Sequence, residues 1–100
     1  MALCKQTDLS YNLNLLSEEA SEVIQAVSKI IRFGEMSVSP YDNNQANIFL
    51  LIKEINDFMA VVELLQEHYG VPILCKDQID KKKAKIAEYK IYSQKEGLLE

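Results

Sequence analysis

Two stretches of the sequence, LLSEEASEVIQAVSKIIRFG (15–34) and NIFLLIKEINDFMAVVELL (47–65), decide the fold. In the first stretch, apolar residues recur at the three- and four-residue spacing of one helical face (Leu16, Ala20, Val23, Val27 and Ile30). The second stretch is apolar over well more than half of its circumference. This spacing predicts one helix over residues 8–33 and another over residues 48–68.

Signals for helix ends bracket both predicted helices. Gly34 is placed to take the left-handed conformation that ends many helices. Residues 35–46 carry turn chemistry and no helical periodicity, so they predict a loop. Asn47 precedes the second apolar run and is expected to be its N-cap, while Gly70 followed by Pro72 marks its end.

A third helix is expected from about residue 77 to residue 93, with Gly97 as a late stop. Its apolar content is thin, so it should lie on the surface of a bundle. Three glycines and two prolines in 100 residues leave little material for the turns of an all-β fold. The sequence therefore predicts a single all-α domain, an antiparallel helical bundle.

The charge of the chain is acidic overall and uneven. A net charge of −4 argues against a nucleic-acid binder. Residues 1–70 carry ten acids against four bases, and residues 71–100 carry seven bases against five acids. Neither a membrane span nor a signal peptide is expected, and the isolated Cys4 and Cys75 are expected to be free thiols. These features favour a cytoplasmic protein that does not contact a membrane.

Two pairs of acids carry the chemistry: Glu19-x-x-Glu22 in the first helix and Glu54-x-x-Asp57 in the second. Residues three apart on a helix are neighbours on one face, so each pair places two like charges side by side. A single such pair on a helix is usually a solvated face. Here, however, Glu54 and Asp57 occupy positions in a stripe that is otherwise apolar (Leu50, Val61 and Leu64), so both are expected to point inward.

An inward carboxylate must be paired, protonated or bound to a cation. If the two helices pack antiparallel, Glu19, Glu22, Glu54 and Asp57 can converge in the cleft between them. Ligands that are all oxygen select Mg²⁺, with Mn²⁺ as a substitute. A di-iron carboxylate site would use Glu-x-x-His motifs, and the one histidine, His68, lacks that spacing and is better suited to a helix C-terminus.

The two quoted stretches resemble the MazG-like, all-α nucleoside triphosphate pyrophosphohydrolases. The marks of that family are E-E-x-x-E on one helix and E-x-x-D on the next, which match Glu18, Glu19, Glu22, Glu54 and Asp57. The resemblance covers residues 15–65 well and the last third only loosely. It implies magnesium-dependent hydrolysis of a nucleoside triphosphate to the monophosphate and pyrophosphate. Glu18 or Glu19 would activate the water.

The substrate-binding residues expected with that activity are basic or polar side chains: Lys29, Arg32, Asn47, Lys82, Lys85 and Tyr89. Lys29 and Arg32 are equally well explained as cations that interact with a helix C-terminus. The lysine run of residues 81–85 is more often a solvated face than a phosphate clamp. Tyr41 or Phe33 is a candidate for stacking on the base.

The apolar surface of the second helix implies a partner subunit, and the resemblance implies a homo-oligomer, a dimer or a tetramer. Two rival hypotheses stay open. One is a non-catalytic helical module that binds a partner or a nucleotide, and the other is an enzyme that acts on a different pyrophosphate, such as a nucleotide sugar or an alarmone.

Overall fold

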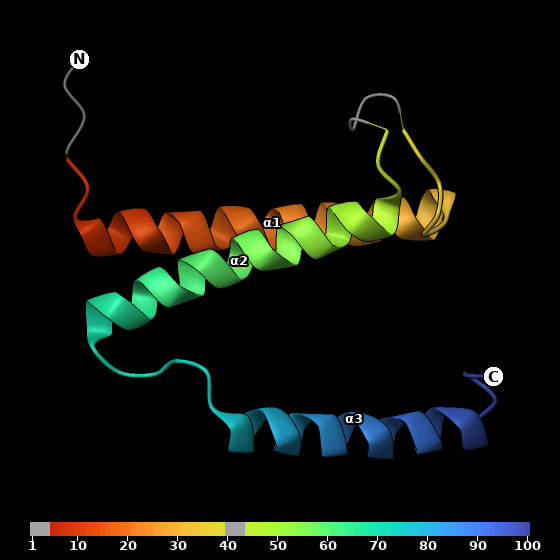
Figure 1. Ribbon diagram of the computed structural model, residues 1–100. Coiled ribbons are helices and arrows are strands. Elements are labelled where there is room, and N and C mark those ends of the chain that lie inside the picture. The colour runs from red at the N-terminus through yellow and green to blue at the C-terminus, as the bar shows by residue number, and fades with distance from the viewer. Residues whose placement is uncertain (1–4, 40–43) are drawn as a thin grey trace.

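The computed structural model describes residues 5–39 and 44–100, and within these residues the chain is all-helical. The helices are α1 (Asp8–Phe33), α2 (Asn47–Tyr69) and α3 (Lys76–Lys95). The described part has no strand, only an isolated antiparallel bridge between Val38 and Ala46. Figure 1 shows α1 and α2 side by side in opposite directions, with α3 apart from both. The all-α class predicted from the sequence is confirmed.

The first helix has the bounds that the periodicity predicts. The Thr7 hydroxyl oxygen accepts a hydrogen bond from the Ser10 backbone N–H at 3.1 Å, which caps the N-terminus. Gly34 ends α1 with φ 94° and ψ 153°. Its φ lies in the range that favours glycine, but its ψ is not that of a left-handed helical residue. The prediction of a left-handed conformation at Gly34 is therefore wrong. Glu35 and Met36 form a turn directly after Gly34.

Asn47 is the first residue of α2 and not its N-cap, which is Ala46. The predicted capping bond is absent; instead, Asn47 Nδ2 donates to the Gly34 carbonyl oxygen at 3.0 Å. Asn47 is only 4% exposed, so its amide needs a partner, and the carbonyl at the end of α1 supplies one. This hydrogen bond ties the beginning of α2 to the end of α1.

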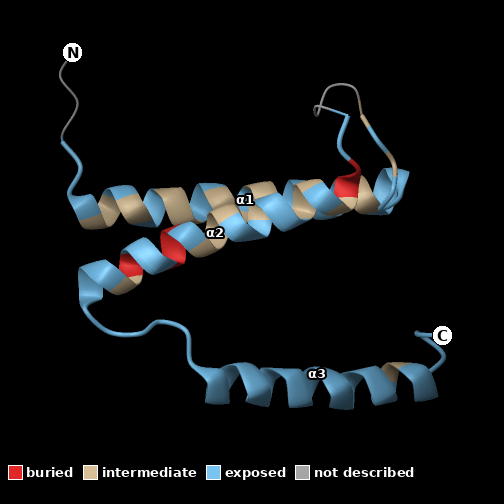
Figure 2. Cartoon of the chain, in the orientation of Figure 1, coloured by how far each residue is buried: buried red, intermediate tan, exposed pale blue. Residues whose placement is uncertain are grey.

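Apart from Asn47, the buried residues among those described in the hairpin are few and apolar. Ala26 of α1 and Val61, Val62 and Leu65 of α2 are buried, with Ala46 beside the loop (Figure 2). Most other residues that face between the helices are half-buried, as expected for a short chain with a limited core. The hairpin is therefore held by a narrow apolar seam along α1 and α2.

The end of α2 follows the sequence signal closely. Gly70 takes a left-handed conformation, φ 70° and ψ 17°, as predicted, and its N–H donates to the Gln66 carbonyl oxygen at 2.8 Å. The Gln66 side-chain oxygen then accepts from the backbone N–H groups of Ile73 and Leu74, at 2.9 and 3.2 Å. These bonds fix the linker that leads to α3.

The third helix does not lie on a bundle, which corrects the expectation from the sequence. Every residue of α3 is exposed except the half-buried Ser93, and α3 contacts neither α1 nor α2. Its isoleucines and tyrosines are spread among seven lysines, so they form no continuous stripe for the hairpin to bind. The exposed ion pair between Lys76 and Asp80, at 2.7 Å, lies in its first turns.

Several large apolar residues of the hairpin also face outward, including Ile24 and Ile31 on α1 and Ile52 and Ile55 on α2. None of the helices described is both long and apolar enough to span a membrane. Cys75 is a free, exposed thiol, as predicted. Cys4, and the loop residues Pro40, Tyr41, Asp42 and Asn43, lie outside the described residues.

Candidate metal centre

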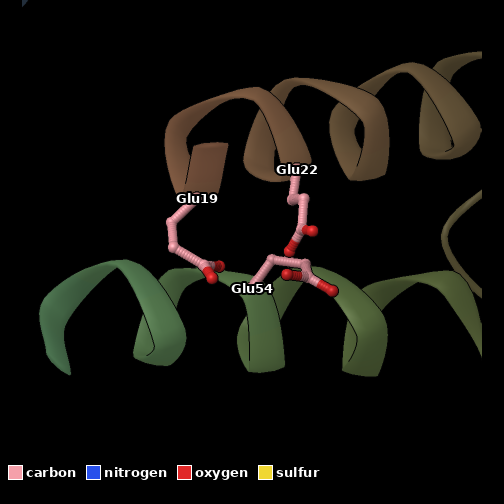
Figure 3. Close-up of side chains that lie close together, drawn as sticks. All are labelled: Glu19, Glu22 and Glu54. Carbon is pink, nitrogen blue, oxygen red and sulfur yellow. The ribbon is translucent and has the colours of Figure 1, made fainter. Parts of the chain in front are cut away.

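Three of the four predicted carboxylates come together between α1 and α2. Glu19 and Glu22 extend from α1 and Glu54 from α2, and each offers an oxygen within 4.8 Å of those of the other two (Figure 3). The three-residue spacing puts the first two on one face of α1. The antiparallel packing of α2 then brings Glu54 toward them.

Two oxygens of this group are buried without a hydrogen-bond partner among the described residues. They are Glu19 Oε2 and Glu54 Oε2, and the Glu54 side chain is only 19% exposed. Leaving buried carboxylate oxygens unpartnered costs free energy. A donor set made only of carboxylate oxygens suits a hard divalent cation such as Mg²⁺. The residues present therefore fit that ion.

The electrostatic environment of these carboxylates also suits a bound cation. Burial raises the pKa of the Glu54 carboxyl above its ordinary value, and the hydrogen bond and negative charge of Glu22 raise it further. The nearby Lys53 ammonium lowers the pKa of Glu54, but by less than burial or the hydrogen bond raises it. A bound cation would offset the burial and the like charge that raise this pKa.

Asp57, the fourth predicted ligand, is not part of the group. Its Oδ2 lies 2.8 Å from Lys53 Nζ in an ion pair, and its side chain is 42% exposed. The same ammonium lies 3.8 Å from Glu54 Oε1. The i, i+4 spacing of Lys53 and Asp57 is the sequence signal for this pair.

A cleft of about 320 Å³ opens beside the carboxylates, between α1 and α2. Its lining combines acidic, basic and apolar side chains: Glu22, Gln25, Ala26, Lys29, Leu50, Lys53 and Glu54. Lys29 was predicted to bind substrate and is half-buried here, whereas Gln25, Leu50 and Lys53 had not been predicted to line a site. One lysine therefore comes from each helix.

Glu18 and Arg32, predicted on α1, lie outside this group. Glu18 is exposed, and its backbone carbonyl oxygen accepts from Ser21 Oγ at 2.6 Å. The guanidinium carbon of Arg32 lies 4.7 Å from the centre of the exposed Phe33 ring. Asn47 is engaged with Gly34, as described above, so its visible role is structural.

The predicted substrate-binding residues of α3 are not brought to the carboxylates. Lys82, Lys85 and Tyr89 are all exposed, on a helix that does not contact α1 or α2. Lys85 Nζ lies 5.9 Å from the centre of the Tyr89 ring. Within the described chain, the site is therefore built by the hairpin alone.

Comparisons with known proteins identified no related protein. A scan against protein-family models found no match, and searches of curated proteins and of solved structures found none either.

Proposed function

We propose that the chain is a magnesium-dependent hydrolase that converts a nucleoside triphosphate to the monophosphate and pyrophosphate. One observation carries the proposal: Glu19, Glu22 and Glu54 converge from two helices with two buried, unpartnered oxygens. The adjoining cleft carries Lys29 and Lys53, which suits a polyanionic substrate next to a cation. The resemblance of residues 15–65 to the MazG-like enzymes supports the same activity.

In this proposal Glu19, Glu22 and Glu54 hold Mg²⁺. When bound, the ion neutralises phosphate charge and lowers the pKa of a water molecule. Water attacks the α-phosphorus, the bond from that phosphorus to the bridging oxygen breaks, and pyrophosphate leaves. Glu19 is the preferred acceptor of the proton from water, because Glu18 is exposed and lies outside the carboxylate group. Lys29 contacts the phosphates.

The same proposal includes self-association. Ile24 and Ile31 on α1 are 68% and 79% exposed, and Ile52 and Ile55 on α2 are also exposed. A second copy of the chain would cover these exposed apolar side chains. Light scattering coupled to gel filtration measures the mass directly, and a monomer at micromolar concentration would contradict this part.

The second candidate function is a helical interaction module without turnover, and the exposed apolar residues and the unpacked α3 favour it. The two candidates differ in their response to metal. A hydrolase gains stability from Mg²⁺ through binding to the folded state, whereas an interaction module with an idle acidic cluster does not.

The test is to measure monophosphate and pyrophosphate formation from a panel of dNTPs and NTPs, with Mg²⁺ or with EDTA. Nucleotide sugars and dinucleoside pyrophosphates belong in the same panel. Glu54→Gln keeps the size of the side chain and removes its charge, so turnover should fall by at least about a hundredfold. Glu63→Gln is the matched control, because Glu63 is an exposed glutamate of α2 outside the group. Equal rates with Mg²⁺ and EDTA, or equal rates in both variants, would reject the proposal.

A further inference from the structure

Lys53 differs from an ordinary surface lysine, because it lines the cleft and lies close to two carboxylates. Its Nζ lies 2.8 Å from Asp57 Oδ2 and 3.8 Å from Glu54 Oε1, so it is shared between two carboxylates of the predicted ligand set. Its side chain is nevertheless 60% exposed and lines the cleft opposite Lys29. It is thus a cation in contact with the acidic group that keeps a path to solvent.

A second pair in the chain shows what an ordinary ion pair of this type looks like. Lys76 Nζ lies 2.7 Å from Asp80 Oδ2, with the same i, i+4 spacing and a side chain 86% exposed. Lys76 does not line the cleft beside the carboxylates, which lie on α1 and α2. The distances within the two pairs are alike, and their surroundings differ.

We propose that Lys53 is the internal counterion of the carboxylate group in the metal-free protein. A divalent cation displaces Lys53 from the carboxylates, and Lys53 then contacts the phosphates of the substrate. This inference rests on the proposed function, since it assigns a role to one more residue of the same site.

The first half of the proposal follows from Coulomb's law. In the metal-free protein the ammonium of Lys53 partly neutralises Glu54 and Asp57. A positive charge at this place opposes the entry of another cation, because the two compete for the same carboxylate oxygens. Once a divalent ion neutralises the group, the attraction that holds Lys53 to Glu54 and Asp57 weakens. Asp57 is then available to the ion as well.

The second half follows from the shape of the cleft. Lys29 on α1 and Lys53 on α2 line the same cavity from two helices. A triphosphate carries several negative charges, and lysine is a compact cation on a long, flexible stem that serves as a point contact for phosphate. A released Lys53 can therefore move from the carboxylates to a phosphate in the cleft, while Lys29 contacts the phosphate chain from the other side.

The experiment compares wild type with Lys53→Met, which keeps most of the stem and removes the charge. Mn²⁺ binding to the metal-free protein is measured by calorimetry. Binding of a triphosphate analogue with a non-hydrolysable α,β bridge is then measured at saturating Mn²⁺. In Lys53→Met, the Kd for Mn²⁺ should fall roughly three- to tenfold. The Kd for the analogue should rise by about fivefold or more.

Controls separate this role from a structural one. Lys76→Met removes the matched pair on α3 and should change neither affinity. Lys53→Gln, with a different stem, should shift both affinities in the same directions as Lys53→Met, and circular dichroism checks that both variants stay helical. Weaker or unchanged Mn²⁺ binding in the two Lys53 variants would overturn the counterion role. Unchanged analogue binding would overturn the phosphate contact.

The outcome for wild type distinguishes this inference from the proposed function. If wild type binds Mn²⁺ and turns over a triphosphate but the Lys53 variants behave like wild type, only the inference fails. If wild type binds no Mn²⁺, both the metal site and the inference fail.

Discussion

The hairpin of α1 and α2 differs sharply from α3, although all three are regular helices. α2 has 23 residues and α3 has 20, and both end at a capping residue. α2 buries Val61, Val62 and Leu65, whereas no residue of α3 is buried. The difference teaches that the sequence signals for forming a helix are local, while packing needs apolar residues repeated along one face.

The two regions also divide the charge of the chain. Every carboxylate of the candidate metal centre belongs to the hairpin, and α3 carries seven of the eleven basic residues. Because α3 contacts neither α1 nor α2, its lysines do not neutralise the acidic group within one chain. The following tests act on this contrast between the hairpin and α3.

The largest expected effect is on the packing seam. Leu65 is 4% exposed, so Leu65→Ala should lower the free energy of unfolding by about 2–5 kcal/mol in urea titrations. Ile86 of α3 is 54% exposed, and Ile86→Ala should change the free energy of unfolding by less than about 0.5 kcal/mol. A large loss in Ile86→Ala would show that α3 is packed in the protein in solution, and the contrast would fail.

A second, smaller loss of stability is expected from a substitution at the junction of α1 and α2. Asn47→Ala removes the hydrogen bond from the buried Asn47 amide to the Gly34 carbonyl and should cost about 1–3 kcal/mol. Asn56→Ala is the control on the exposed face of α2, where the side chain bonds only to its own helix at Ile52. Thermal unfolding of both variants measures the difference. Equal shifts would mean that the Asn47 bond contributes nothing specific.

Metal removal should affect the hairpin alone. With Mg²⁺ at ten times its Kd, the free energy of unfolding should rise by about 1.4 kcal/mol over the value in EDTA. Glu54→Gln should abolish this gain, and Glu88→Gln on α3 should preserve it. Persistence of the gain in Glu54→Gln would place the binding site elsewhere in the chain.

The smallest expected effect is the pH dependence of the metal-free protein. The pKa of Glu54 is raised in the folded state from an ordinary 4.5. The folded protein therefore holds this proton more tightly than the unfolded chain, and stability falls as pH rises from 4.5 through the raised pKa. Urea titrations in EDTA across this range should show the fall in wild type and a smaller one in Glu54→Gln. A steeper fall in the variant would contradict the assignment.

Much of this could be predicted, because it depends on neighbours in sequence. The periodicity of residues 8–33 gave the bounds of α1 correctly, and Gly70 ends α2 in the predicted conformation. The pairing of Glu19 with Glu22 on one face follows from helical geometry. The inward position of Glu54 could also be read from its apolar stripe, and its side chain is in fact mostly buried.

The errors arose where a side chain had more than one possible partner. Asn47 has the chemistry of an N-cap, but the packed hairpin offers its amide the Gly34 carbonyl instead. Asp57 shares a face with Glu54, but it pairs with Lys53 and stays outside the group of three. The spacing in the sequence allows either partner for each of these two side chains. Which partner each one takes depends on where the neighbouring groups lie in the packed hairpin.

The sequence by itself thus determined three helices, their ends to within a few residues, and two acidic pairs on the faces of α1 and α2. The tertiary structure decided which carboxylates meet, that Lys29 and Lys53 line one cleft, and that α3 stays apart from the hairpin. The physical reason is that helical periodicity fixes directions around each axis. The rotation and offset of one helix against another depend on how their side chains pack.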